Sequence, residues 1–128
     1  MISLKVMKSW CVSKLDYTAF AIEWEAAWNS HSLDRILAHY SEDVVFRSHK
    51  AMRLVGVGEL KGKQALRAYW AAALEKQPDL SFVVVDVLQG YGMMVITYRN
   101  QHNVLAAETL RFGSDGMVIE ASACHVKP

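Results

Sequence analysis

Hydrophobic residues recur at helical spacing in three segments before Pro78. From Leu15 to Asn29 they follow the i, i+3, i+4, i+7 pattern, which predicts a helix with one buried stripe. Ser32 is a typical N-cap for a second, shorter helix, and Pro78 ends a third helix predicted over Lys63 to Gln77. The three inward stripes are Tyr17, Phe20, Ala21, Trp24, Ala27 and Trp28; Leu33, Ile36, Leu37 and Tyr40; and Ala65, Leu66, Tyr69, Trp70, Ala73 and Leu74.

The pattern changes to strand-like alternation in the second half of the chain. One strand is predicted earlier, between the second and third helices, around Val44 to Phe46, where β-branched and aromatic residues adjoin. After Pro78, strands are predicted at about 80–89, 92–100, 105–113 and 117–126, separated by short turns. Turns this short join antiparallel neighbours, so the second half is predicted to be a four-stranded meander. The fold class is therefore α+β, with three N-terminal helices followed by an antiparallel sheet.

The segment from His49 to Lys61 shows neither period. Gly56 and Gly58, together with the basic residues Lys50 and Arg53, predict a mobile loop of the kind that often forms a lid.

Composition narrows the class of protein. The chain has 128 residues, which suits one domain, and 14 Lys and Arg against 13 Asp and Glu leave a net charge of +1. Scattered basic residues argue against nucleic-acid binding, and no apolar run is long enough to span a membrane. Cys11 and Cys124 imply no disulfide framework, so a cytoplasmic location is expected. Residues 1–14 are predicted to be an N-terminal arm without signal-peptide features; a strand or a subunit contact there stays open.

Three segments carry a resemblance to a known family. They are AWNSHSLDRILAHYSEDVVFRS (27–48), GELKGKQALRAYW (58–70) and AETLRFGSDGMVIEASACH (107–125). In these the sequence resembles the nuclear transport factor 2-like superfamily, in its SnoaL-like and ketosteroid-isomerase-like branch. The resemblance implies a single domain over residues 15–128, built as a cone in which a strongly curved sheet (a cystatin-like roll) wraps a helix and leaves an open apolar pocket. It also implies a homodimer formed through the outer face of the sheet. Because this fold hosts unrelated activities, it does not fix the reaction.

Glu108 is the first candidate catalytic residue. Strand alternation places it on one face with apolar neighbours, which predicts that its carboxyl points into the cone. Poor solvation there would raise its pKa and make it a proton donor. The resemblance adds that related isomerases and cyclases use an acid in this strand. The alternative is an outward Glu108 paired with a lysine or arginine.

His125 is the second candidate. Alternation in the last strand puts Ile119, Ala121, Ala123 and His125 on the face that bears Glu108, and a Glu–His pair inside a pocket is a workable acid–base couple. The alternative is a half-exposed histidine that frays near the C-terminus.

Two positions depart from ketosteroid isomerases. That branch has its carboxylate base where this chain has Ser48 and its oxyanion tyrosine where this chain has Trp24. Serine is no base unaided and an indole N–H only donates, so that mechanism is not expected. His49 is a further candidate base if the loop turns it inward.

Aromatic side chains are the candidate pocket wall, with plain core packing as the alternative for each. Together they predict a large, flat, apolar cyclic or aromatic ligand. Alternation leaves open whether Tyr98 and Asn100 or Thr97 and Arg99 face inward, and an inward Arg99 would pair with Glu108. The candidate substrate-binding residues are Trp24, Trp28, Tyr40, Phe46, Ser48, His49, Trp70 and Tyr98, with Tyr69 as a further wall residue.

No metal or other cofactor is expected, because the histidines are dispersed and form no ligand spacing. Two functions remain. The first is an enzyme of the isomerase, cyclase or dehydratase type with Glu108 as proton donor and acceptor, and the second is a non-catalytic ligand-binding or accessory domain.

Overall fold

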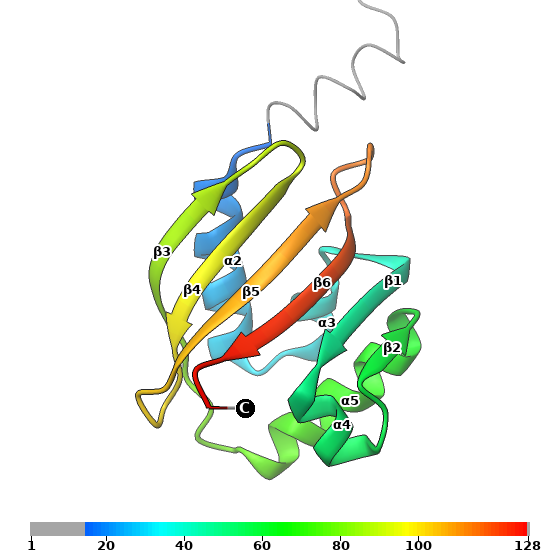
Figure 1. Cartoon of the computed structure of the whole chain (residues 1–128), viewed down its shortest axis with the longest axis vertical. Helices are drawn as coiled ribbons and strands as arrows, with labels where there is room; N and C mark the ends of the chain where they lie inside the picture. Colours follow the sequence, from blue (N-terminus) through cyan, green and yellow to red (C-terminus); the bar gives the residue numbers. More distant parts are fainter. Residues whose placement is uncertain (1–14, 128) are drawn as a thin grey trace, which may run out of the picture.

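The structure, a computed structural model, describes residues 15–127 (Figure 1). The predicted N-terminal arm, residues 1–14, lies outside the described residues. Within them, helices pack on one face of a curved, unclosed sheet, and the fold is the predicted α+β cystatin-like roll. None of the described helices has the length and hydropathy needed to cross a bilayer.

The first helix begins and ends close to its predicted bounds, but the second is shorter than predicted: it ends at Leu37, and Tyr40, expected on its inward stripe, begins the first strand. Helix α2, Tyr17–Ser30, begins at Asp16, whose carboxylate accepts a hydrogen bond from the backbone N–H of Ala19 at 2.9 Å. It ends at His31, which adopts the left-handed conformation at φ 62°. Helix α3, Leu33–Leu37, is capped by the hydroxyl of Ser32, as expected.

The prediction of a loop from His49 to Lys61 is wrong. It contains helix α4, His49–Val55, and strand β2, Glu59–Lys61. The hydroxyl of Ser48 accepts hydrogen bonds from the backbone N–H groups of Lys50 and Ala51 and caps the helix, and Gly56 ends it at φ 78°. A seven-residue helix shows no full hydrophobic stripe, so only its caps signal it.

Helix α5, Lys63–Lys76, matches the third predicted helix and stops just before Pro78. It lies across β1, Tyr40–Ser48, which is longer than the predicted strand. Strand β2 pairs antiparallel with β1 at the edge of the sheet.

The C-terminal meander is confirmed. Its strands are β3 (Val83–Gln89), β4 (Met93–Arg99), β5 (Leu105–Phe112) and β6 (Val118–His125), each antiparallel to the next. Strand β1 joins the other side of β6 in parallel, which extends the sheet to the order β2-β1-β6-β5-β4-β3.

One expected face in β6 needs correction. The register of β5 and β6 shifts between Arg111 and Phe112, so Phe112 pairs with Val118. Val118 is therefore fully buried, whereas Ile119 is only half-buried. Beyond this bulge the predicted alternation holds, and Ala121 and Ala123 pair with Leu110 and Glu108.

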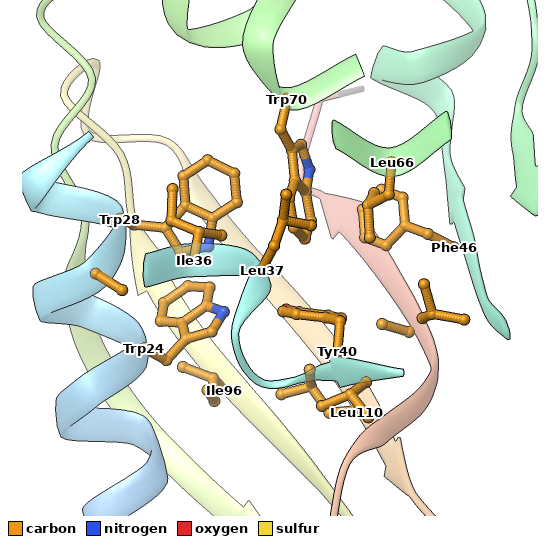
Figure 2. Packing of buried hydrophobic residues seen from close by; sticks show 14 of the residues in the cluster. Trp24, Trp28, Ile36, Leu37, Tyr40, Phe46, Leu66, Trp70, Ile96 and Leu110 are labelled. Carbon is orange, nitrogen blue, oxygen red and sulfur yellow. The ribbon is translucent and has the colours of Figure 1, made fainter. Parts of the chain in front are cut away.

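The core is an aromatic cluster centred on Trp70 of α5 (Figure 2). Its ring packs edge-on against Trp28 of α2, Tyr40 and Phe46 of β1, with centroids 4.9, 5.1 and 5.5 Å apart. Each such pair contributes about 0.5–1.5 kcal/mol beyond the burial of its area. Trp70 thus joins α2, α5 and β1, and the hollow of the cone lies beside it.

Candidate functional site

A cavity of about 60 Å³ lies between α5 and the concave face of the sheet. This volume is room for a few water molecules, whereas a closed cavity that holds a benzene ring measures about 150 Å³. Its wall is formed by Trp28, Phe46, Ser48, Lys50, Tyr69, Trp70, Ala73, Gln77, Leu80, Phe82, Tyr98, Asn100, Glu108, Ala123 and His125.

Glu108 is the acidic residue of this wall. It lies in the middle of β5, between Ile96 of β4 and Ala123 of β6 in the ladder, and only 4% of it is exposed. Among residues 15–127 no hydrogen bond or ion pair engages its carboxyl, and burial raises its pKa to about 8. Desolvation of the charged form is the cause, so the group is mostly a neutral carboxylic acid at neutral pH.

Strand alternation explains this placement. In β5 the buried residues are Ala106, Glu108, Leu110 and Phe112, while Ala107 and Thr109 turn to the outer face. The outward alternative for Glu108, paired with a basic residue, does not occur.

Tyrosine hydroxyl groups share the surroundings of Glu108. Burial, and then the negative charge that Glu108 carries when ionised, raise the pKa of Tyr98 well above its usual value. Burial also raises the pKa of Tyr69, and the hydroxyl of Ser48 opposes that rise. Both phenols therefore stay protonated at neutral pH and can donate a hydrogen bond into the cavity.

Tyr98, rather than Arg99, faces inward. Tyr98 is buried, whereas Arg99 is exposed and donates a hydrogen bond to the backbone carbonyl of Asn103 at 3.2 Å. The possible pairing of Arg99 with Glu108 is thus absent, and no cation lowers the pKa of this carboxyl.

His125 ends β6 and lines the same cavity, opposite Ala106 in the ladder. Burial, together with the positive charges of Lys50 and Arg53, lowers its pKa to about 4. The imidazole is therefore neutral at neutral pH and has a nitrogen lone pair available to accept a proton. His125 belongs to the ladder and is not frayed, but within the described chain no hydrogen bond joins it to Glu108.

Comparison with known proteins agrees with this architecture. The model of the SnoaL-like domain family matches residues 21–126. The chain belongs to the SnoaL-like family. No curated protein matches it in sequence.

Solved structures of similar fold support the assignment. A SnoaL-like protein of unknown function from Burkholderia thailandensis is 38% identical, with a TM-score of 0.81 over 86% of this chain and 94% of its own. A candidate isomerase of the SnoaL-like family from Agrobacterium tumefaciens is 15% identical, with a TM-score of 0.69 over 85% and 96%. TerC, co-crystallised with polyporic acid, is 10% identical, with a TM-score of 0.72 over 87% and 92%. At these lower identities the likeness shows the fold alone.

The SnoaL-like fold brings most of the predicted wall residues together and leaves three outside the cavity. Trp28, Phe46, Ser48, Tyr69, Trp70 and Tyr98 line it. Trp24 and Tyr40 are buried in the core and do not, so for these two the packing alternative holds. His49 lies on the other side of Ser48, in a surface hollow with Arg47 and Met52, and is not a base of this cavity.

Sequence reasoning missed several wall residues. Lys50 is one of them, because it lies in the short helix α4, which has no hydrophobic period that sequence patterns could detect. Phe82 lies just before β3 and packs against Tyr98, with ring centroids 4.5 Å apart. Ala123 is not among the predicted wall residues, although strand alternation places it on the same face as Glu108. Among residues 15–127 no three His, Cys, Asp or Glu side chains lie close enough together to hold a metal ion.

Proposed function

We propose that this protein is a small-molecule enzyme that carries out acid–base chemistry, of the isomerase, cyclase or dehydratase type, on an apolar cyclic or aromatic substrate. One observation carries the proposal: Glu108 is a buried carboxyl that lines an aromatic cavity and has no hydrogen-bond or ion-pair partner among residues 15–127. Burying a carboxyl in this way costs stability, and such groups concentrate at functional sites.

The proposed chemistry begins with Glu108 as an acid. Because the carboxyl is protonated at neutral pH, it can donate a hydrogen bond, and then its proton, to a substrate carbonyl oxygen. Negative charge that develops on this oxygen would be stabilised by donors that are already in place, with Tyr98 and Tyr69 as further candidates.

His125 is the proposed proton acceptor. As a neutral imidazole it can take the proton from the carbon next to the carbonyl while Glu108 protonates the oxygen, which yields an enol. Return of the proton from His125 to a different carbon, and from the enol oxygen to Glu108, completes an isomerisation. Ser48 takes no part as a base, because its hydroxyl caps α4.

The relatives are compatible with this proposal. One protein of the SnoaL-like family with this fold is named as a candidate isomerase, and TerC, which shares the fold, was crystallised with polyporic acid. The inner cavity is smaller than one aromatic ring, so a cyclic ligand would extend through the mouth.

The alternative is a non-catalytic ligand-binding or accessory domain of the same fold. The small volume of the inner cavity favours it, since much of the cone is filled by side chains.

Proton transfer can be tested before the natural substrate is known. The protein is incubated in D2O with 1-tetralone, a bicyclic ketone, and exchange of the protons next to the carbonyl is followed by NMR. Glu108→Gln should slow the protein-catalysed exchange roughly 100-fold or more. Glu120→Gln is the matched control, because Glu120 is exposed and pairs with Arg47 and Arg111 on the outer face. Equal exchange in wild type and Glu108→Gln would remove Glu108 from the chemistry, and ligand binding without exchange would favour the alternative.

A further inference from the structure

A second, larger hollow of about 370 Å³ adjoins the inner cavity at its mouth. The two share Lys50, Tyr69, Ala73 and Gln77, so together they form one passage from the surface to Glu108. The outer part is formed by α4, the end of α5 and the turn between β4 and β5, which gather at the end of the molecule where β6 stops (Figure 1).

The outer hollow is positively charged. The cations Lys50, Arg53 and Lys76 line it together with His102, and among residues 15–127 neither hollow has an acidic lining residue apart from Glu108, which is mostly protonated at neutral pH. The net charge of the chain is only +1, so this concentration of cations is local.

These cations have no ion-pair partner within residues 15–127. Elsewhere in that part of the chain Arg35, Arg47, Lys63, Arg67 and Arg111 pair with carboxylates, whereas Lys61, Arg99 and Lys127 are unpaired there but line neither hollow. Cations that are left together without a counter-charge in a concave site attract anions and steer them inward.

The positive field reaches the inner cavity. Burial, and then the charge of Arg53, lowers the pKa of Lys50, and Lys50 and Arg53 both contribute to the low pKa of His125. The positive charges at the mouth therefore act on His125 in the inner cavity, and an anion bound at the mouth would offset their effect on its pKa.

We propose that the ligand of this site is a cyclic or aromatic acid whose carboxylate binds Lys50 and Arg53 while its ring enters the aromatic cavity beside Trp70. The inference rests on the proposed use of this cavity as the substrate site and names its substrate class. The inner cavity alone is smaller than a ring, so the ring spans the inner cavity and the adjoining part of the outer hollow, which also holds the charged group in contact with water. This orientation points the far edge of the ring at Glu108.

Two probes that differ only in charge test this proposal. Naphthalene-2-carboxylate and naphthalene-2-carboxamide have the same rings and nearly the same shape. Binding is measured by calorimetry and by quenching of tryptophan fluorescence, which Trp28 and Trp70 in the wall should report. The carboxylate should bind the wild type at least tenfold more tightly than the amide, and added salt should reduce this preference.

Substitutions of Lys50 and Arg53 test whether these residues cause the preference for the carboxylate. Lys50→Met and Arg53→Gln should weaken binding of the carboxylate towards that of the amide and leave the amide unchanged. Lys61→Met is the matched control, since Lys61 is exposed, has no ion-pair partner among the described residues and lines neither hollow. If a variant fails to fold, the salt dependence of the carboxylate preference in the wild type still tests whether the ligand's charge is recognised. Equal affinity for the two probes, or no binding of either, would overturn the proposal.

The test is separate from that of the proposed function. Glu108→Gln should keep the preference for the carboxylate, because pairing with Lys50 and Arg53 does not need its proton. A charge preference without proton exchange would refute the enzymatic proposal and leave an acid-binding protein. Exchange on 1-tetralone without a charge preference would refute only the acidic ligand.

Discussion

Glu108 lies directly opposite Ala123 in the antiparallel ladder of β5 and β6, and both line the inner cavity. Paired residues on one face of a sheet have Cβ atoms about 5 Å apart. On the β6 side the carboxyl therefore has only a methyl group as its cross-strand neighbour, while Ile96 lies opposite on the β4 side, and the small side chain of Ala123 leaves space beside the acid.

Ala123→Leu should close that space. The added carbons would occupy the inner cavity, so binding of naphthalene-2-carboxylate should weaken more than tenfold. The melting temperature should change by only a few degrees, because the leucine fills existing space instead of displacing core atoms. Ala107→Leu, on the outer face of β5, is the control and should bind normally. Unchanged binding in Ala123→Leu would place the ligand elsewhere.

The pKa of Glu108 predicts how stability depends on pH. It is about 8 in the folded protein against 4.5 for the free group. Below about 4.5 both states hold the proton, but between 4.5 and 8 only the unfolded chain releases it. The free energy of unfolding should therefore fall as pH rises through this window, by at most about 5 kcal/mol (3.5 pKa units at about 1.4 kcal/mol each).

Glu108→Gln isolates this effect, because glutamine does not titrate. Urea unfolding at pH 5, 7 and 9 should show the variant gaining stability relative to wild type as pH rises, with the gain levelling off above pH 8. All other titrating groups are common to both proteins and cancel. A difference that stays constant across the three pH values would mean that the carboxyl is ionised when folded.

Tyr40 provides a different kind of test. Its hydroxyl is buried without a hydrogen-bond partner in the described part of the chain, although the indole nitrogen of Trp24 points towards it (Figure 2). Removing an unsatisfied polar group costs little, so Tyr40→Phe should leave the free energy of unfolding unchanged or raise it. Tyr17→Phe is the matched comparison, because Tyr17 donates a hydrogen bond to the carbonyl of Gly90 at 3.0 Å, and it should lose about 1 kcal/mol. Equal losses in the two variants would indicate that Tyr40 has a partner, such as a bound water.

Much of the fold follows from the sequence because its signals are periodic and long. The stripe of α2, the proline after α5 and the short turns of the meander each specify their element locally. The parallel pairing of β1 with β6 does not, since it joins segments that are about 75 residues apart and depends on how the helices pack between them. Helix α4 is too short for a stripe, and its caps at Ser48 and Gly56 were the available signal.

The residues of the site are also predictable only where a local pattern marks them. Glu108 was found because a charged residue among alternating apolar ones is conspicuous in a strand. Lys50 was not, since its place at the mouth depends on the turn of α4 and on the position of α5. The facing of Tyr98 also required the structure, because the residue count of a turn does not fix which side of the next strand faces inward.

The outer face of the sheet is where a second copy of the chain is proposed to bind. On β4, β5 and β6 this face carries the charged residues Arg99, Arg111 and Glu120, but also residues that are small or apolar: Val95, Thr97, Leu105, Ala107 and Cys124. Ala107→Arg should therefore shift a dimer towards monomer in analytical ultracentrifugation, because a buried unpaired charge destabilises an interface. Glu59→Arg, at the edge strand β2, is the control for added charge. A wild type that sediments as a monomer at all concentrations would refute the dimer.

His125 links the charged mouth to the proposed chemistry. Since Lys50 and Arg53 contribute to its low pKa, Lys50→Met should raise that pKa from about 4, though not to 6.5, because burial acts first. Bound naphthalene-2-carboxylate should raise it as well by neutralising the same charges, whereas the amide should not. An acid that binds at the mouth would thus make His125 a stronger base when the substrate is present. NMR titration of the imidazole protons measures this pKa in the wild type, in Lys50→Met and with each probe bound. A pKa that responds to neither Lys50→Met nor the carboxylate would show that the mouth does not act on the proposed acid–base pair.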